Sequence, residues 1–133
     1  AKGGLNALPK MHFPGGLLSG CNAGTLNAAK IKGVHTAMKT GMLAAEEIFA
    51  AVAAGDEGGK DLQGYAERFE ASWVYEELYA TRNFGPALHK FGTLIGGAFN
   101  FIDQNIFNGK LPFTLHDNHL DYAQMKPVTE CVK

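Results

Sequence analysis

The sequence has few cysteines and almost no excess of either charge. Its two cysteines, Cys21 and Cys131, stand far apart, with no Cys-x-x-Cys pair. This spacing argues against a disulfide framework and against a metal site, so we expect two reduced thiols. The 12 Lys and Arg residues are matched by 13 Asp and Glu residues. Because no basic cluster could neutralise phosphates, nucleic-acid binding is not expected.

Long hydrophobic runs are also missing. No stretch approaches the roughly 18 apolar residues of a membrane-spanning helix, and residues 1–4 show no signal-peptide core. With 133 residues, 46% of them hydrophobic, the chain can bury a modest core. Its opening at Ala1 is typical of a fragment of a longer protein.

Glycine, by contrast, is abundant, with 17 residues, and it is favoured where a backbone turns tightly or is approached closely. The residues FPGG at 13–16 predict a turn. The apolar run that follows predicts a buried strand of about four or five residues that ends near Gly20. A loop of small and polar residues, 21–32, comes next.

A long helix is predicted from about Gly33 to Ala54. Its apolar residues recur at steps of three and four and predict one buried stripe: Val34, Ala37, Met38, Met42, Ala45, Ile48, Phe49 and Val52. Gly41 costs a helix interior about 1 kcal/mol relative to Ala, so we expect a close neighbour there. The glycines of residues 55–59 end the helix.

The second half of the chain predicts more helices, so the expected fold class is mainly α with a short β element. Residues 62–82 predict one or two short helices with a break near Ala71-Ser72 and aromatic side chains in the core. The run 88–107 predicts another helix, with Pro86 in its first turn and a stop at Asn108-Gly109.

This half also contains a glycine pair with two possible roles and a segment without helical periodicity. Gly96-Gly97 indicates a close contact or a bend in the last helix. Pro112 and the polar tail 116–133 are expected to form coil on the surface.

Residues 17–35 combine a strand, a short glycine-containing loop and a glycine-led helix, an order that can cradle a phosphate or a cofactor. A helix N-terminus offers unpaired N–H groups and about half a positive charge. Gly20, Gly24 and Gly33 would let a flat or anionic ligand approach the main chain. Taken alone, this pattern is more often a purely structural turn, and the Gly-x-Gly-x-x-Gly fingerprint is absent from the chain.

Three stretches resemble the electron transfer flavoprotein-ubiquinone oxidoreductase family. They are FPGGLLSGCNAGTLNAAKIKGVHTAMKTGMLAAEEIF at 13–49, SWVYEELYATRNFGP at 72–86 and GKLPFTLHD at 109–117. The closing KPVTECVK is similar to the linker that leads to the family's iron-sulfur domain, and Asp103-Gln104-Asn105 resembles bacterial members. The resemblance covers most of the chain, in order.

This resemblance implies a fragment of an FAD/NAD(P)-binding α/β fold, the fold of flavoproteins with two dinucleotide-binding motifs. Residues 1–58 would close the FAD-binding domain, and residues 59–115 would be a helical region beside the quinone and membrane surface. Residues 116–133 would be a linker towards an absent iron-sulfur domain.

The resemblance implies a cofactor-binding set and no catalytic or metal-ligating residue. The set is Gly20, Cys21, Gly24, Asn27, Gly33, Val34 and His35. In flavoproteins with two dinucleotide-binding motifs, Gly-Asp stands at the place of Gly20-Cys21, and the Asp carboxylate binds the ribityl chain of FAD. The resemblance therefore implies that a backbone contact or a weak thiol hydrogen bond replaces the carboxylate here. The N–H groups of residues 33–35 would face the flavin's pyrimidine oxygen and N1, where reduction adds negative charge.

Other side chains near this set leave alternatives open. A histidine can carry protons near neutral pH, but for His35 a role in backbone and packing is favoured. Lys30 and Lys32 would face the cofactor's negative charge or be solvated. Cys21 is not expected to be a redox thiol, and Cys131 resembles the family's linker cysteine.

The intact protein would be an FAD-dependent oxidoreductase. By the resemblance, it takes electrons from reduced electron transfer flavoprotein through a 4Fe-4S cluster and FAD to ubiquinone. It would be peripheral on the inner membrane, on the cytoplasmic face in bacteria or the matrix face in mitochondria. Residues 94–107 would insert shallowly into one leaflet, with an ordinary core helix as an equal alternative.

The isolated chain is expected to be inactive and to bind FAD weakly at best, because the first dinucleotide motif and the cluster cysteines are missing. Rival interpretations are a related flavoprotein, of the geranylgeranyl reductase or nitrogen-fixation type, and a non-catalytic helical interaction module.

Overall fold

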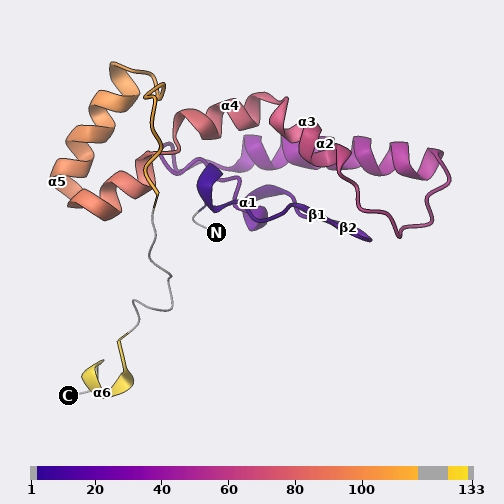
Figure 1. Cartoon of the computed structure of the whole chain (residues 1–133), viewed down its shortest axis with the longest axis horizontal. Coiled ribbons are helices and arrows are strands. Elements are labelled where there is room, and N and C mark those ends of the chain that lie inside the picture. Colours follow the sequence, from indigo (N-terminus) through magenta and orange to yellow (C-terminus); the bar gives the residue numbers. More distant parts are fainter. Residues whose placement is uncertain (1–2, 117–125, 132–133) are drawn as a thin grey trace.

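Helices form most of the chain described by the computed structural model, which covers residues 3–116 and 126–131 (Figure 1). A short 3₁₀ turn, η1 (Leu5–Ala7), leads to a hairpin of β1 (His12–Phe13) and β2 (Gly16–Leu17). The α-helices in the described residues are α1 (Gly20–Ala23), α2 (Val34–Ala53), α3 (Gly64–Glu70), α4 (Trp73–Ala80), α5 (Phe84–Asn105) and α6 (Val128–Cys131). The expected class, mainly α with a short β element, is confirmed.

The strand predicted to end near Gly20 is wrong in its length and its burial. β2 has two half-buried residues and pairs antiparallel with β1, with His12 opposite Leu17. The chain then passes through Ser19 directly into α1, so no longer strand can form. Gly20 has a φ of 69°, a left-handed conformation that glycine adopts without steric cost. Gly20 and Cys21 therefore begin a helix and do not end a strand.

The long helix predicted between Gly33 and Ala54 is confirmed as α2, but the buried face is not the predicted one. The buried residues of α2 are Thr36, Thr40, Leu43 and Ala44. The threonines tolerate burial because the Thr36 hydroxyl donates to the Gly33 carbonyl at 2.9 Å and the Thr40 hydroxyl donates to the Thr36 carbonyl at 2.9 Å.

The predicted stripe is largely exposed, and we call its six large members the α2 apolar stripe. They are Val34, Met38, Met42, Ile48, Phe49 and Val52. Val34 is 76% exposed and Phe49 is 75% exposed. Gly41 has no atom within 4 Å of the place where its Cβ would stand, so the expected close neighbour is not found among the described residues.

The core lies between α2 and the pair α3 and α4, whose break at Ala71-Ser72 confirms the prediction. In Figure 1, α3 and α4 lie along one side of α2, and α1 and the hairpin lie on the other. The core residues come from both sides of residue 58: Met11, Ala23, Leu43, Ala44, Tyr65, Phe69, Val74 and Leu78. Trp73 and Tyr79 are each 44% exposed, so the prediction that the aromatic residues fill the core is wrong for these two.

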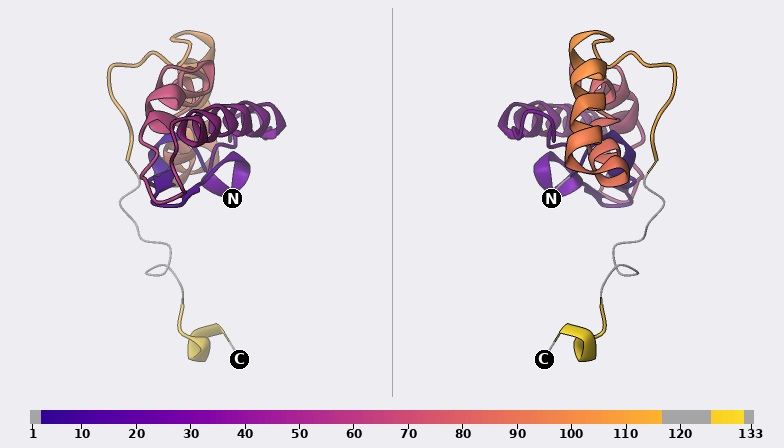
Figure 2. Two further views of the ribbon diagram at one scale, coloured as in Figure 1. Left: turned by 90° about the vertical axis from the view of Figure 1, so that its right-hand side faces the viewer. Right: turned by 90° about the vertical axis from the view of Figure 1, so that its left-hand side faces the viewer.

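The predicted last helix is α5, which starts with Pro86 in its first turn and bends at Gly92. Gly92 has a φ of 74° and a ψ of 179°, so the bend lies there and not at Gly96-Gly97. Gly96 instead provides a close contact, because a Cβ on it would lie 2.5 Å from the Ala87 carbonyl oxygen. Figure 2 shows the longer part of α5 at a steep angle to α2.

The segment after α5 is held by one buried arginine. The Arg82 guanidinium, 4% exposed, donates to the carbonyls of Gly109 (2.7 Å), Leu111 (2.5 Å) and Phe113 (3.2 Å). Its Nε donates to the hydroxyl of Thr114 at 3.0 Å. Pro112 therefore lies in an irregular segment, as expected.

Two further expectations, a coiled tail and the lack of a membrane-spanning helix, concern residues that the structure describes only in part. The tail predicted as coil contains the short helix α6, which is a correction. Residues 117–125 and 132–133 lie outside the description. Within the described residues, no helix is both long enough and apolar enough to cross a bilayer.

Candidate functional site

The predicted site centres on the start of α2, where the backbone donors are free. Gly33 precedes the helix, and no side chain caps it. The first paired N–H is that of Ala37, which donates to the Gly33 carbonyl at 2.8 Å. Within the described residues, the N–H groups of Val34, His35 and Thr36 have no acceptor. Such donors carry the partial positive charge of a helix N-terminus.

A closed turn directly before Gly33 fixes the entry into α2. The N–H of Asn27 donates to the Lys32 carbonyl at 3.0 Å, and the N–H of Lys32 donates to the Asn27 carbonyl at 3.3 Å. The side-chain oxygen of Asn27 accepts the N–H of Lys30 at 3.1 Å. Ile31 has a φ of 52°, which is unfavourable for a β-branched residue. The surrounding hydrogen bonds therefore hold a strained backbone in place.

A cluster of side chains joins this turn to α4, and we call it the Glu77 cluster: Asn27, Lys30, His35, Trp73 and Glu77. The Glu77 carboxylate accepts from Nδ2 of Asn27 at 2.7 Å and from Nε2 of His35 at 2.8 Å, and lies 3.4 Å from Nζ of Lys30. The His35 ring stacks on the Trp73 ring, with centroids 5.8 Å apart and an interplanar angle of 8°.

Sequence reasoning missed Glu77 and Trp73, which lie more than thirty-five residues from the glycine-rich segment. The signal that could have found them is local. Residues four apart on a helix share one face, so Trp73 and Glu77 point the same way from α4. Only the packing of α4 beside α2 shows that this face meets His35.

The charge of Glu77 follows from its surroundings. Burial raises the pKa of the Glu77 carboxyl, but the hydrogen bonds from His35 and Asn27 and the charge of Lys30 lower it more, so the pKa lies below its ordinary value. Glu77 is therefore ionised at neutral pH. Its contribution to stability is present above the ordinary pKa and is lost as the pH falls through the lowered value.

The three glycines of the predicted site are packed against protein atoms. A Cβ on Gly20 would lie 3.3 Å from the Cβ of Ala37, and one on Gly24 would lie 3.5 Å from Cδ2 of Leu8. A Cβ on Gly33 would meet the sulfur of Cys21, which is half-buried in α1. The left-handed backbone of Gly20 and Gly24, with φ of 69° and 98°, and the close packing at Gly33 thus explain these glycines, and contact with a ligand stays a prediction.

The structure gathers part of the predicted set at one place. Gly33, Val34, His35 and Asn27 lie together at the start of α2, and Cys21 touches Gly33 from α1. The Asn27 side chain is fully buried and uses both its ends within the protein, and its backbone N–H and carbonyl are paired with Lys32. Contact of Asn27 with a ligand therefore stays a prediction. Lys30 is paired with Glu77, whereas Lys32 is exposed.

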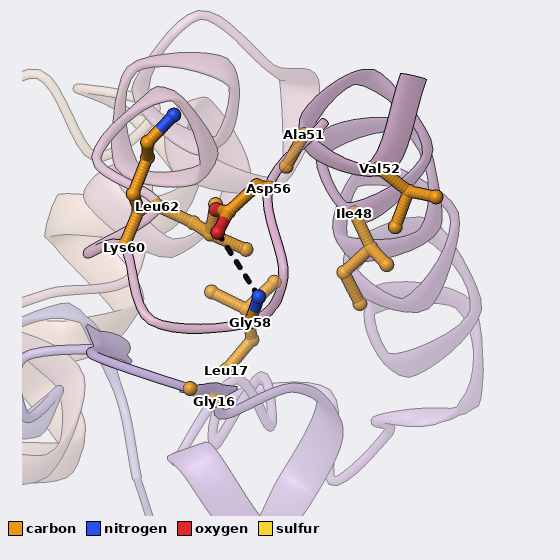
Figure 3. Close-up of a pocket in the computed structure, with 10 residues that line it drawn as sticks. Gly16, Leu17, Ile48, Ala51, Val52, Asp56, Gly58, Lys60 and Leu62 are labelled. Carbon is orange, nitrogen blue, oxygen red and sulfur yellow. Dashed lines mark hydrogen bonds between the residues drawn. The ribbon is translucent and has the colours of Figure 1, made fainter. Parts of the chain in front are cut away.

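A cavity of about 180 Å³ lies at the other end of α2 (Figure 3). Ile48 and Val52 form its apolar wall, and the loop after α2 closes it, with the Asp56 carboxylate accepting the N–H of Gly58 at 3.0 Å. Because Ile48 and Val52 follow Val34 by 14 and 18 residues in α2, this cavity is about 21–27 Å along the helix from the predicted site and is a separate feature.

Two buried oxygens in α5 have no hydrogen-bond partner, Oδ1 of Asn100 and Oδ1 of Asp103. Asp103 is fully buried. Burial raises the pKa of the Asp103 carboxyl, although a hydrogen bond from Gln104 and the charge of Arg82 act in the opposite direction. In the described part of the chain, no three His, Cys, Asp or Glu residues come together to hold a metal ion.

The donor set at the start of α2 fits the electron-rich edge of a flavin. It offers N–H groups without acceptors in the described residues and a partial positive charge, and no side chain caps it. The residues that would hold the edge are Gly33, Val34 and His35, with Thr36 as a further donor that the sequence prediction did not include.

The chain is similar to several proteins of one name. No protein-family model matches it. The electron transfer flavoprotein-ubiquinone oxidoreductase of Pseudomonas aeruginosa is 65% identical over 132 residues, which is 99% of this chain and 24% of that protein. A protein of Acinetobacter baylyi that is named a probable electron transfer flavoprotein-ubiquinone oxidoreductase is 57% identical, over 94% of this chain and 24% of its own length.

A more distant relative gives the same result. The mitochondrial protein of this name from Bos taurus is 43% identical over 98% of this chain and 22% of its own length. The chain therefore spans about a quarter of the length of the curated relatives it matches. It corresponds to one segment of the electron transfer flavoprotein-ubiquinone oxidoreductases that it matches.

Proposed function

We propose that this chain is the part of an FAD-dependent oxidoreductase that binds the electron-rich edge of the flavin. The observation that carries the proposal is the start of α2, where three N–H groups have no acceptor in the described residues. The names of the relatives support an electron-transferring oxidoreductase, because each name joins electron transfer flavoprotein and ubiquinone as the two partners of an oxidoreductase.

FAD, when bound, supplies the reversible uptake and release of electrons. The chain's own residues would bind and orient it. The N–H groups at Gly33, Val34 and His35 would donate to the flavin, and Gly20, Cys21, Gly24 and Asn27 would line the approach through their backbone. The partial charge at the helix start favours added negative charge on the neighbouring group, so it would raise the affinity for the reduced form more than for the oxidised form.

The intact protein would pass electrons from reduced electron transfer flavoprotein through a 4Fe-4S cluster and FAD to ubiquinone. We assign residues 1–58 to the FAD-binding domain, 59–115 to the helical region and 116–133 to the linker. The exposed α2 apolar stripe supports this division, because a stripe of six large apolar side chains would be covered by a further part of a longer polypeptide.

Contact with a membrane surface is supported by α5 and the turn after it. Their exposed apolar residues are Phe91, Leu94, Ile95, Phe101, Ile102, Ile106 and Phe107. An amphipathic helix with such a face lies in the interface plane and inserts shallowly. We therefore propose a peripheral protein on the inner membrane, facing the cytoplasm in bacteria or the matrix in mitochondria.

Titration of the purified chain with FAD, followed by flavin fluorescence, tests the division of the binding site. The 133 residues lack the first dinucleotide motif, so only weak binding is expected, and stoichiometric binding below about 1 μM would contradict this expectation. The same titration of the longer protein that carries this segment should give tight binding. A longer protein that binds no FAD overturns the proposed function.

A co-flotation assay with anionic vesicles tests the membrane surface. Leu94→Glu places a charge on the exposed face of α5 and should abolish flotation of the longer protein. Val128→Glu is the matched control, because Val128 is 75% exposed but lies on α6. Equal flotation of both variants and the wild type would remove α5 from the membrane contact.

A further inference from the structure

One carboxylate on α4 holds the two segments that present the free donors of α2. Glu77 accepts from the turn before α2, through Asn27 at 2.7 Å, and from the first turn of α2, through His35 at 2.8 Å. Its side chain is 19% exposed, so water competes little for these bonds. Glu77 therefore fixes the position of the Val34–Thr36 N–H groups without lying on the same helix.

We propose that Glu77 is a positioning residue for the flavin edge, acting through Asn27 and His35 and balancing the charge of Lys30. This inference rests on the proposed function. The relatives' names and the sequence pattern assign nothing to Glu77. Removal of the Glu77 carboxylate should have two separate consequences. One concerns the position of the α2 N–H groups, and the other concerns the charge of Lys30.

The positional consequence concerns the strained turn. Ile31 keeps its φ of 52° within a turn whose Asn27 side chain is anchored at Glu77. Without the carboxylate, the turn and the His35 ring lose their common acceptor. The N–H groups of α2 would then be less well ordered, which weakens binding of oxidised FAD.

The charge consequence concerns Lys30, whose Nζ lies 3.4 Å from the Glu77 carboxylate. Without that carboxylate, the Lys30 charge adds to the positive end of α2. Both act on the same neighbouring group, so the negatively charged reduced flavin gains relative to the oxidised flavin. The reduction potential of the bound flavin should therefore rise.

Trp73 gives a readout that needs no flavin. It is the chain's only tryptophan, and the His35 ring lies parallel to it. Indole emission depends on what lies against the ring, so Trp73 fluorescence reports whether His35 keeps its place. Glu77→Gln should change the emission of the purified 133-residue chain, because a neutral amide oxygen accepts less strongly than the charged Oε1 that now binds both Asn27 and His35, and because the amide N–H₂ would face Lys30.

Glu76→Gln is the matched control, because Glu76 precedes Glu77 on α4, is exposed, and makes no hydrogen bond or ion pair in the cluster. It should leave Trp73 emission unchanged. Equal emission of the wild type and both variants overturns the proposal at this step, whether or not the longer protein binds flavin.

The flavin readout uses the longer protein that carries this segment. Glu77→Gln should weaken the affinity for oxidised FAD about tenfold, the effect of about one hydrogen bond to a charged group. If the affinity for reduced flavin is unchanged, the two-electron potential rises by about 30 mV. A purely structural role of Glu77 would weaken both forms equally and leave the potential unchanged, which would overturn the proposal.

Lys30→Met keeps the experiment decisive if Glu77→Gln does not fold, because the Lys30 side chain is 56% exposed. This variant removes the positive charge and leaves the Glu77 carboxylate in place, so the flavin potential should fall. An unchanged or raised potential contradicts the charge balance. If the wild-type protein binds no FAD, the proposed function fails, and the Trp73 result still decides the geometry of the cluster.

Discussion

The sulfur of Cys21 lies against the backbone of Gly33, in the place that a Cβ of residue 33 would occupy. This contact brings α1 against the start of α2 and sets the position of the α2 N–H groups. The φ of Gly33 is −137°, which other residues also adopt, so the requirement for glycine comes from packing and not from backbone strain.

Gly33→Ala should destabilise the chain, because the new methyl group meets both the Cys21 sulfur and, at 2.9 Å, Cδ1 of Leu26. Overpacking of this kind costs about 1–3 kcal/mol in the free energy of unfolding, which urea denaturation measures. Gly41→Ala in the same helix is the control, since no atom lies within 4 Å of its Cβ position, and it should stabilise by about 1 kcal/mol. Equal effects of the two substitutions would contradict the contact.

The two neighbouring glycines of α5 should respond in opposite directions. Gly96→Ala places a methyl group 2.5 Å from the Ala87 carbonyl oxygen and should destabilise by about 1–3 kcal/mol, as the bent helix opens. Gly97→Ala meets no atom within 4 Å and should stabilise by about 1 kcal/mol. Thermal unfolding of both variants checks this. A stabilising Gly96→Ala would show that the two parts of α5 do not pack together.

Arg82→Met should cost about 3 kcal/mol or more in the free energy of unfolding. The substitution leaves the carbonyls of Gly109 and Leu111 without their donor, whereas the Phe113 carbonyl still accepts from Asn83. Arg68→Met is the control, because that exposed arginine bonds no backbone carbonyl of the described residues and pairs there only with the exposed Glu46 and the half-buried Glu47, so it should change stability by about 1 kcal/mol or less. Denaturant titration of both variants decides between a structural and a dispensable role for Arg82.

The stability difference between the wild type and Asp103→Asn should depend on pH. Burial raises the pKa of Asp103 in the folded chain, whereas an unfolded Asp titrates near about 3.9. The folded state therefore binds this proton more tightly. Its stabilising effect is present below the unfolded pKa and is lost as the pH rises through the folded pKa, so the wild type should lose stability relative to the variant over that range.

Unfolding curves at a series of pH values from about 4 to 8 measure this difference. Glu57→Gln, a charge change in the exposed loop after α2, is the control and should give a difference that does not vary with pH in the same way. A constant difference for Asp103→Asn would show that Asp103 does not titrate differently in the folded and unfolded states.

The positions of the longer helices, α2 to α5, were predictable, because they depend on local signals, whereas the short helices α1 and α6 were not predicted. The break at Ala71-Ser72 and the glycines after Ala54 lie where the structure ends its helices. The resemblance to flavoproteins also followed from the order of residues 13–49, and the relatives confirm it. The face of α2 that is buried was not predictable, because two threonines can be buried once their hydroxyls bond to the helix backbone.

The sequence by itself determined the positions of the longer helices and the protein family that the chain resembles, since turn residues, periodicity and motifs are properties of neighbouring residues. Only the tertiary structure decided which side chains surround the start of α2. Glu77 and Trp73 reach Asn27 and His35 because α4 packs beside α2, and that contact depends on the burial of Val74 and Leu78 in a shared core. A contact between distant residues is selected by the free energy of the whole core, which no local pattern contains.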